Sequence, residues 1–345
     1  MSGKVVELLK TLVGLRSPSG HEENVREFVI DYLEKAGLSP EVDEVGNVIV
    51  RTVRTVGAGE FWVTAHLDTV NTNYPFRHEN GICYGTGVAD DKASVAAMLL
   101  LARELGSDLN LNLAFFVDEE ETGIGSQHFA EKERPGIAVV MEPTELKVCN
   151  QHWGVFEFFV TVRGKASHAA VPDAGINAID GALKLVERLK DLSLRHGSIF
   201  NILSLESEPK DLYITPYECR LKAEFLLPES SRVVFEVMQL LEDYDYQILE
   251  VADPFTSGLS AEMLEEAIIA SGMIPEKSSM PSWTDAVNLK KAGWDAVVFG
   301  PGSLATSHTE RECVRVEEVV KAVEVLKNLS RIAASTKSHK ILRNA

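Results

Sequence analysis

The chain has 345 residues, more than one hydrophobic core usually organises, and this length predicts two domains. A hydrophobic fraction of 45% and a charged fraction of 25% exclude a disordered chain and are typical of a globular protein. The 52 acidic and 34 basic residues give a formal net charge of −18, which argues against a nucleic-acid partner and mildly favours cationic substrates.

Cysteine usage and hydropathy predict a cytoplasmic protein. The cysteines are far apart and form no CxxC pair, so we expect free thiols in a reducing compartment. The N-terminal segment MSGKVVELLKTLVGL contains Glu7 and Lys10 and lacks the apolar core and cleavage site of a signal peptide. No window approaches the roughly eighteen uninterrupted apolar residues that cross a bilayer, so we expect no membrane partner.

Helices alternate with short apolar strands over most of the chain. Helices are expected over 5–15, 23–36, 90–105, 261–270 and 316–329. Strands are expected over 41–51 (as a hairpin), 61–65, 111–117, 139–141 and 296–299, with a polar loop between 70 and 84. This alternation predicts an α/β structure with a mostly parallel sheet flanked by helices.

The pattern changes between residues 155 and 253. Alternating strand segments and two helices, over 176–192 and 233–241, follow the order βαββαβ. This is the order of a ferredoxin-like α+β module. We therefore predict an inserted domain over 155–253, and a catalytic domain formed by 1–154 and 254–345.

Polar residues follow the predicted strands directly. His66 and Asp68 come after the strand 61–65, and their spacing places both on one face, where the carboxylate can orient the imidazole. Asp90 and Asp91 open the helix 90–105, where carboxylates could equally be caps.

Two further strands end in acidic residues. The strand 111–117 runs into the acidic run 118–121 (DEEE), and the strand 139–141 runs into Glu142. Ligands gather at the carboxyl ends of parallel strands, so we expect these side chains at one edge of the sheet. Four consecutive carboxylates raise one another's pKa unless a cation neutralises them, and this favours a metal site.

Two divalent ions that share a bridging carboxylate would account for the whole set of polar residues. The set is His66, Asp90, one glutamate of the run 118–121, Glu142 and His308. Nitrogen and oxygen ligands without thiolate suit zinc, with cobalt or manganese as alternatives. Each residue taken alone is more often an ordinary polar side chain, and only the ordered set favours a metal site.

Several motifs occur in the order seen in a known superfamily: HLDTV, GTGVADDK, VDEEETGIGS, MEPTE, GKASHAAVP, WTDA and SHTEREC. Over nearly its whole length the chain resembles the di-zinc amidohydrolases and exopeptidases, which include acetylornithine deacetylase, succinyl-diaminopimelate desuccinylase, aminoacylase, lysine-biosynthesis deacylase and glutamate carboxypeptidase. The resemblance implies a zinc-exopeptidase-like fold and two zinc ions per chain. It implies that His66 and Glu142 bind one zinc, His308 binds the other, Asp90 bridges both, and Asp68 orients His66.

The resemblance also places a general base and a metal ligand in the run 118–121. The family's Asp-Glu-Glu motif assigns the base to Glu119 and the ligand to Glu120. A shift by one residue would assign Glu120 and Glu121 instead. We prefer the first assignment because Asp118 then matches the family's Asp and the spacing to Gly125 is unchanged.

The inserted module is implied to act as a lid and dimerisation domain. His168 would be a surface histidine by its sequence alone, but it matches a histidine that reaches, often from a partner subunit, toward the scissile carbonyl and steadies the oxyanion. We therefore expect a homodimer formed through this module, and Asn201 as a further substrate contact. Leu226 stands where members often carry an arginine for a substrate carboxylate, and Arg195 and Arg220 are the candidate replacements.

These observations predict a metal-dependent hydrolase that cleaves the amide bond of an N-acyl amino acid through a di-zinc-activated water, with Glu119 as the base. The resemblance is to acetylornithine and acetyl-lysine deacetylases of lysine or arginine biosynthesis. A di- or tripeptidase or a carboxypeptidase of the same superfamily is one alternative. A non-catalytic binding protein on the same fold is the other, and an incomplete ligand set would favour it.

Overall fold

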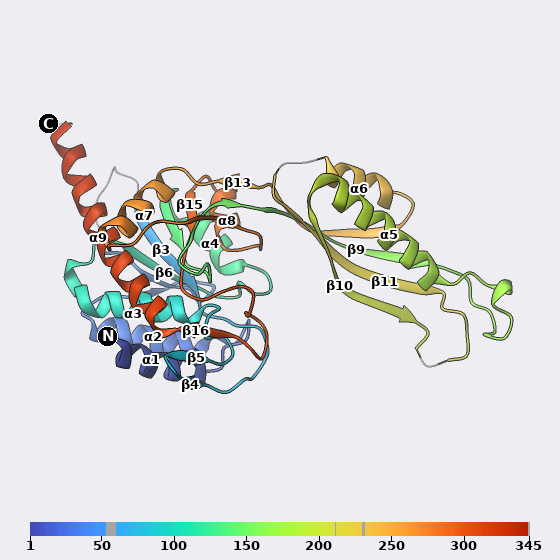
Figure 1. Ribbon diagram of the computed structural model, residues 1–345, viewed down its shortest axis with the longest axis horizontal. Helices are drawn as coiled ribbons and strands as arrows, with labels where there is room; N and C mark the ends of the chain where they lie inside the picture. Colours follow the sequence, from blue (N-terminus) through green and yellow to red (C-terminus); the bar gives the residue numbers. More distant parts are fainter. Residues whose placement is uncertain (53–59, 211, 230–231, 344–345) are drawn as a thin grey trace. The chain divides into compact units, whose positions relative to one another are not determined.

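The computed structural model describes residues 1–52, 60–210, 212–229 and 232–343 (Figure 1). The chain divides into two compact units. Unit 1 comprises Met1–Gln151, Ser257–Met280 and the chain from Thr284 on, and unit 2 comprises His152–Thr256 and Pro281–Trp283. Unit 2 therefore interrupts unit 1 in sequence.

Unit 1 is built on a mixed sheet whose centre is parallel. Its strands lie in the order β1 (Glu41–Val42), β2 (Val48–Val50), β6 (Asn112–Phe116), β3 (Phe61–His66), β7 (Ile137–Val140), β15 (Asp295–Val298) and β8 (Val148–His152), with β14 (Lys277–Met280) beside β8. β3 is parallel to β6 and β7, and β7 is parallel to β15, whereas β1, β2 and β8 pair in antiparallel fashion. The predicted α/β fold with a mostly parallel sheet is confirmed.

Helices flank this sheet on both faces (Figure 1). They are α1 (Ser2–Gly14), α2 (Glu23–Lys35), α3 (Lys92–Leu105), α4 (Ile124–Lys132), α7 (Leu259–Ala270), α8 (Ala286–Lys291) and α9 (Val316–Arg343). The alternation along β3 shows why both faces must be covered. Phe61 and Val63 join the main apolar core, whereas Trp62 points to the opposite face and packs against Phe129 of α4 and Trp294.

In unit 1, the elements α4, α8, β8 and β14 were not predicted from the sequence, and two predicted segments differ from what was expected. The expected polar loop contains a hairpin of β4 (Arg77–Glu79) and β5 (Ile82–Tyr84), and β5 also pairs with β16 (Cys313–Arg315). The turn residues Asn80 and Gly81 have φ of 51° and 79°, and Asn-Gly is a strong sequence signal for such a turn. The last helix, expected to end at residue 329, continues to 343 because no Gly or Pro follows to stop it.

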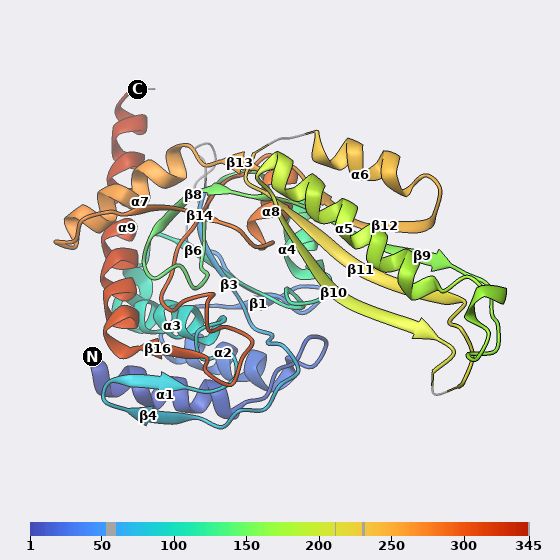
Figure 2. The same ribbon diagram turned by 45° about the vertical axis from the view of Figure 1, so that its right-hand side comes forward.

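Unit 2 follows the order βαββαβ that the sequence predicted. Its main elements are β9 (Gly154–Arg163), α5 (Ala178–His196), β10 (Ile199–Glu208), β11 (Glu218–Leu227), α6 (Val233–Leu241) and β12 (Asp245–Ala252). The strands form an antiparallel sheet in the order β10-β11-β9-β12, and α5 and α6 lie on one of its faces (Figure 2). Phe156 and Phe158 of β9 are buried beneath these helices, whereas Phe159 is exposed on the open face.

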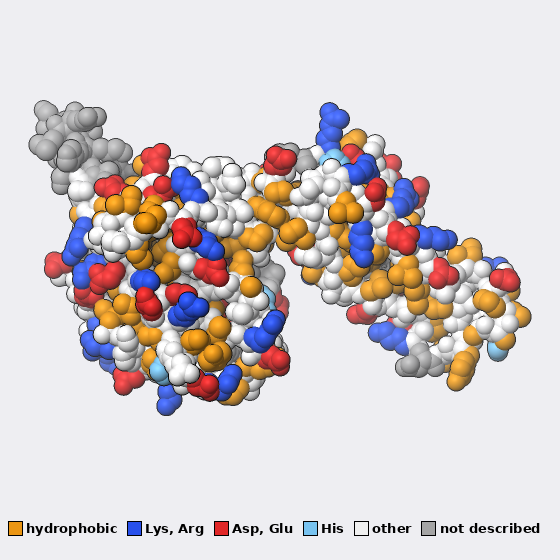
Figure 3. Space-filling model, viewed as in Figure 1, with side chains coloured by type: hydrophobic (Ala, Val, Ile, Leu, Met, Phe, Trp, Pro, Cys, Tyr) orange, Lys and Arg blue, Asp and Glu red, His pale blue; other side chains and the backbone are white. Residues whose placement is uncertain are grey.

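Charged side chains of both signs are interspersed over the face of the molecule seen in Figure 3. On this face the acidic side chains therefore do not form one continuous patch, although the chain as a whole has a net charge of −18. Among the described residues, no helix combines the length and the apolar character needed to span a bilayer.

Candidate metal centre

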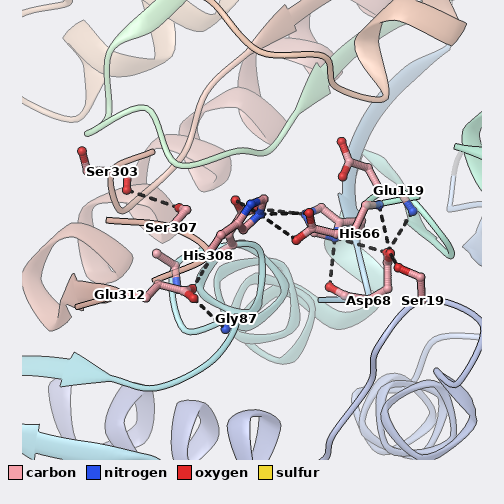
Figure 4. Close-up of polar contacts among 12 residues, drawn as sticks. Ser19, His66, Asp68, Gly87, Glu119, Ser303, Ser307, His308 and Glu312 are labelled. Atoms are coloured by element: carbon pink, nitrogen blue, oxygen red, sulfur yellow. Dashed lines mark hydrogen bonds and ion pairs between the residues drawn. The ribbon is translucent and has the colours of Figure 1, made fainter. Parts of the chain in front are cut away.

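Side chains from distant parts of unit 1 meet where its parallel strands end (Figure 4). His66 is the last residue of β3, Glu119 and Glu120 follow β6, and Glu142 follows β7. Because these three strands are parallel neighbours, their carboxyl ends lie at the same edge of the sheet. Asp90, just before α3, and His308, from the loop that precedes β16, complete the cluster.

Asp90 lies between two histidines. One of its oxygens, Oδ1, is 3.1 Å from His66 Nε2, and the other, Oδ2, is 3.4 Å from His308 Nε2. His308 Nε2 also lies 2.9 Å from Oε2 of Glu120. The ligand atoms of His66, Asp90 and Glu142 lie within 4.8 Å of one another, and so do those of Asp90, Glu120 and His308. The two groups share Asp90, which is the arrangement expected of a bridging carboxylate.

The electrostatics of the cluster favour a bound cation. Burial, together with the charges of Glu119 and Asp90, raises the pKa of Glu142 well above its usual value. Glu142 is almost fully buried, and its Oε1 has no hydrogen-bond partner. Hydrogen bonds to Asp90 and Glu120 raise the pKa of His308. Crowded carboxylates and two imidazoles, with no thiolate among them, form a donor set that fits divalent metal ions such as zinc.

Asp68 supports both His66 and the acidic run. It is fully buried, and its Oδ1 lies 3.3 Å from His66 Nδ1. Its carboxylate accepts the backbone N–H groups of Glu119 and Glu120, both at 3.0 Å, and the hydroxyl of Ser19 at 2.7 Å. Burial of His66 would by itself lower the pKa of the ring, but the carboxylates of Asp68 and Asp90 raise it well above its usual value.

The structure separates the three glutamates of the run 118–121. Glu120 belongs to one ligand group, Glu119 lies close to the cluster without belonging to either group, and Glu121 is exposed. Burial and nearby carboxylates, among them Asp285, raise the pKa of Glu119 well above its usual value. Asp118 has a φ of 58°, so the chain turns sharply after β6 and need not point successive side chains in opposite directions.

Two of the residues selected from the sequence lie in unit 2. His168 is exposed, and its Nδ1 accepts the backbone N–H of Ala170 at 3.1 Å. Asn201 on β10 donates through Nδ2 to Glu224 at 2.9 Å. Neither side chain belongs to the two ligand groups of unit 1.

The arginine replacements considered for a substrate carboxylate already have acidic partners. Arg220 lies 2.9 Å from Glu218, and Arg195 pairs with Asp191 at 3.1 Å and with Glu236 at 3.3 Å. Leu226 sits on β11 opposite Ile199 of β10 and is partly exposed. Neither arginine is therefore a free cation for a substrate carboxylate.

Two buried acids lie beside the cluster and were not predicted from the sequence to have a role in it. Glu312 is 2% exposed and accepts backbone N–H groups from the loop that carries Asp90. Asp285 is 1% exposed, and burial raises its pKa to about 7. Glu312 lies within the motif SHTEREC and Asp285 within WTDA. Both contact residues far away in sequence, so no local pattern indicated these contacts.

Comparison with known proteins identifies the family. Residues 62–331 match the model of the family described as peptidase family M20/M25/M40. The chain belongs to this family. It is therefore an enzyme, an amidohydrolase of the zinc amidohydrolase and exopeptidase superfamily, rather than the non-catalytic binding protein kept as an alternative.

Individual relatives cover nearly the whole chain. A protein of Pyrococcus furiosus, provisionally named a LysW-lysine/LysW-ornithine hydrolase, is 28% identical in an alignment that covers 94% of this chain and 95% of the relative. A provisionally named carboxypeptidase of Aspergillus clavatus is 26% identical in an alignment that covers 91% of this chain and 85% of the relative. The crystal structure of a tripeptidase from Staphylococcus aureus, 19% identical, has the same fold, with a TM-score of 0.83 over 97% of this chain and 99% of the other.

Proposed function

We propose that this M20/M25/M40 family member is a zinc-dependent deacylase that cleaves the amide bond of an N-acyl amino acid. The observation that carries the proposal is the position of Asp90 between His66 and His308, with Glu142 on one side and Glu120 on the other. His66 and Glu142 would hold one ion, Glu120 and His308 a second, and Asp90 both. Zinc suits these ligands, and cobalt or manganese would also be accepted.

The ions, when bound, supply Lewis-acid polarisation of the scissile carbonyl and lower the pKa of water. Glu119 is the proposed general base. Its carboxylate lies beside the two ligand groups, and burial raises its pKa well above its ordinary value, which makes it a stronger base than an exposed glutamate. Glu119 takes a proton from the attacking water and returns it to the leaving nitrogen. Asp68 holds the backbone of Glu119 in place for both transfers.

His168 is the proposed oxyanion donor. Its Nδ1 accepts the N–H of Ala170, so a neutral ring carries its proton on Nε2. An exposed Nε2–H on a loop of unit 2 is available to donate to the oxygen of a tetrahedral intermediate. Asn201 remains a candidate substrate contact, although its amide is engaged by Glu224.

We propose a lysine- or ornithine-type amine as the product, released from an acetyl or carrier-linked acyl group in lysine or arginine biosynthesis. The name of the Pyrococcus furiosus relative supports this choice, and an acidic chain suits a basic product. The second candidate is a di- or tripeptidase or a carboxypeptidase, which the name of the Aspergillus clavatus relative supports.

The chain's assembly and location are further proposals. β10 is an edge strand whose side chains Ile199, Ile202, Leu203 and Leu205 are each at least 40% exposed. Exposed apolar edge strands pair readily with another chain, so we propose a homodimer formed through β10 of unit 2. The cysteines are free thiols in the structure, which supports a cytoplasmic location.

One experiment tests the activity. The metal content of the purified protein is measured, and amine release is followed from N-acetyl-ornithine, N-acetyl-lysine, N-succinyl-diaminopimelate and dipeptides, with and without added zinc or cobalt. About two metals per chain with selective release from an N-acyl amino acid is the expected result. Preferential release from dipeptides would select the peptidase instead, and a protein that binds no metal would refute the proposed centre.

A further inference from the structure

Glu312 ties together two loops that are more than two hundred residues apart in sequence. Its carboxylate accepts the backbone N–H of Gly87 at 3.0 Å through Oε2, and those of Ala89 at 2.9 Å and Asp90 at 3.1 Å through Oε1. Its own backbone carbonyl also faces the N–H of Gly85, at 3.4 Å. One residue therefore accepts from four N–H groups of the loop that ends in Asp90, and Figure 4 shows its contact with Gly87.

The loop from residue 85 to residue 90 is shaped to present these donors. Gly85 and Gly87 have φ of 139° and 72°, which brings successive N–H groups onto one side of the chain. A Cβ atom at position 87 would lie 2.3 Å from the methyl carbon of Thr69, so the close approach of the loop to Thr69 requires glycine. Concave backbone of this kind commonly binds an external anion. Here the anion is the internal carboxylate of Glu312.

Glu312 also belongs to the loop that carries His308. Glu312 lies four residues after His308, and its N–H donates to the carbonyl of Thr309 at 3.0 Å, which closes a turn next to the histidine. His308 itself has a φ of 64°, a conformation that needs support from its surroundings when the residue is not glycine. The loops that carry Asp90 and His308 are thus joined at Glu312.

We propose that Glu312 is a positioning residue of the metal centre, and that it sets the geometry of the site formed by Asp90, Glu120 and His308. This inference rests on the proposed metal centre. Two of the three ligands in that group stand on the loops joined by Glu312, whereas only Asp90 does so in the group of His66, Asp90 and Glu142. Loss of Glu312 therefore weakens binding of the second zinc, the ion that Asp90, Glu120 and His308 would hold, more than binding of the first.

The test uses three variants of the full-length protein. Glu312→Ala removes both acceptor oxygens and with them three hydrogen bonds, and Glu312→Gln keeps one oxygen but turns an NH₂ group toward N–H donors. Glu310→Gln is the matched control, since Glu310 is an exposed glutamate of the same loop. Each variant is titrated with zinc against a competing chelator, the visible spectrum is recorded after loading with cobalt, and kcat and KM are measured separately.

We expect the loss of zinc affinity to differ between the two ions and between the two Glu312 variants. Affinity for the second zinc falls about 10-fold to 100-fold, as is usual when a residue that supports a ligand is lost, with Glu312→Ala the more severe. Affinity for the first zinc falls less. The cobalt spectrum shifts, and kcat falls at nearly constant KM. Folded Glu312 variants with wild-type affinity for both equivalents and an unchanged cobalt spectrum would overturn the inference. A wild-type protein and a Glu310→Gln variant that both fail to bind two metals would refute the proposed centre instead.

Discussion

The buried carboxylate of Asp68 accepts the backbone N–H of Glu119 at 3.0 Å, while the same oxygen lies 3.3 Å from Nδ1 of His66. A single side chain thus sets both the orientation of a proposed ligand and the position of the proposed base. Glu120 donates to the second oxygen of Asp68, so the other proposed ligand on this loop is held as well. The acidic run after β6 is therefore ordered by Asp68 and not by its own sequence.

Asp68→Asn keeps the size of the side chain but removes its charge and one acceptor. Asparagine has one acceptor oxygen, which cannot serve both backbone N–H groups and the His66 ring. Its NH₂ group would face a donor in place of the second oxygen. We expect kcat/KM to fall about 10-fold to 100-fold, with weaker zinc binding. Steady-state kinetics and zinc titration check this, with Asp31→Asn on the exposed surface of α2 as the control. Wild-type values in a folded Asp68→Asn protein would remove Asp68 from the centre.

Substitution of each glutamate in the run 119–121 by glutamine distinguishes the two possible assignments. Glu119→Gln is expected to keep bound zinc but to lose turnover by about 10²-fold to 10⁴-fold, since the base is gone. Glu120→Gln is expected to lower zinc content because Glu120 belongs to a ligand group. Glu121→Gln, at an exposed position, serves as the control and should resemble wild type.

Metal content by elemental analysis and kcat for the same preparations provide the measurement. Lost turnover with full metal content in Glu120→Gln, and lost metal in Glu121→Gln, would establish the shifted assignment instead. Near wild-type activity in Glu119→Gln would show that Glu119 is not the base.

The sequence predicted those features of the site that depend on local geometry. The spacing of His66 and Asp68 after a buried strand predicted that the carboxylate faces the ring, and their atoms are 3.3 Å apart. The alternation of short strands and helices likewise predicted the parallel centre of the sheet. Asn80-Gly81 carried a hairpin signal that the polar composition around it obscured.

The features that the sequence did not predict depend on contacts between distant segments. Glu312 reaches the loop of Asp90 across 222 positions, and no local pattern distinguishes it from the exposed Glu310 two residues earlier. Glu119 and Glu121 are also indistinguishable by local sequence pattern. The turn at Asp118 and the carboxylate of Asp68 place Glu119 beside the metal centre and leave Glu121 exposed. Motif order was therefore more informative than composition or spacing.

Removal of the metal should destabilise unit 1 as well as abolish activity. Without a cation, the carboxylates of the cluster repel one another, and burial adds to the cost of their charge. Zinc at about 100 times its dissociation constant would stabilise the fold by about 3 kcal/mol, so thermal scans of chelator-treated protein should show a higher Tm after zinc is added back.

A pair of nearby glutamates gives this measurement its control. Glu142→Gln should lose most of the zinc response because Glu142 belongs to a ligand group. Glu145→Gln, three residues along and exposed, should keep it. A Tm that does not depend on chelator or zinc would contradict the proposed centre.

The edge strand β10 gives a direct test of the proposed dimer. Replacing Ile202 and Leu205 together by lysine places two charges on the exposed edge, and charged edges resist strand pairing. We expect this variant to be monomeric by light scattering coupled to size-exclusion chromatography. Leu194→Lys, at an 83% exposed position on α5, is the control and should remain dimeric. A dimer that persists in the double variant would exclude β10 as the interface.

His152 makes the stability of unit 2 depend on pH. It is 1% exposed, its ring lies against Phe255 with 4.8 Å between ring centroids, and its Nδ1 donates to the carbonyl of Trp153 at 2.7 Å. Burial disfavours the charged ring and lowers the pKa of His152 to about 4. In the unfolded chain the ring takes up its proton near its ordinary value of about 6.5. The stabilisation is therefore complete above that value and is lost as the pH falls from there toward 4.

Between pH 7 and pH 5 this protonation should cost about 2 kcal/mol of unfolding free energy. His152→Phe keeps an aromatic ring against Phe255 but does not titrate, so its stability should fall less over the same interval, although it loses the hydrogen bond to Trp153 at every pH. Chemical denaturation gives the unfolding free energy of both proteins at pH 7 and at pH 5. Protonation of the metal centre affects both proteins equally, so it cancels when the two losses of free energy are compared. The exposed His78, replaced by glutamine, provides the control and should follow wild type. Equal losses in wild type and His152→Phe would mean that His152 does not remain neutral in the folded protein.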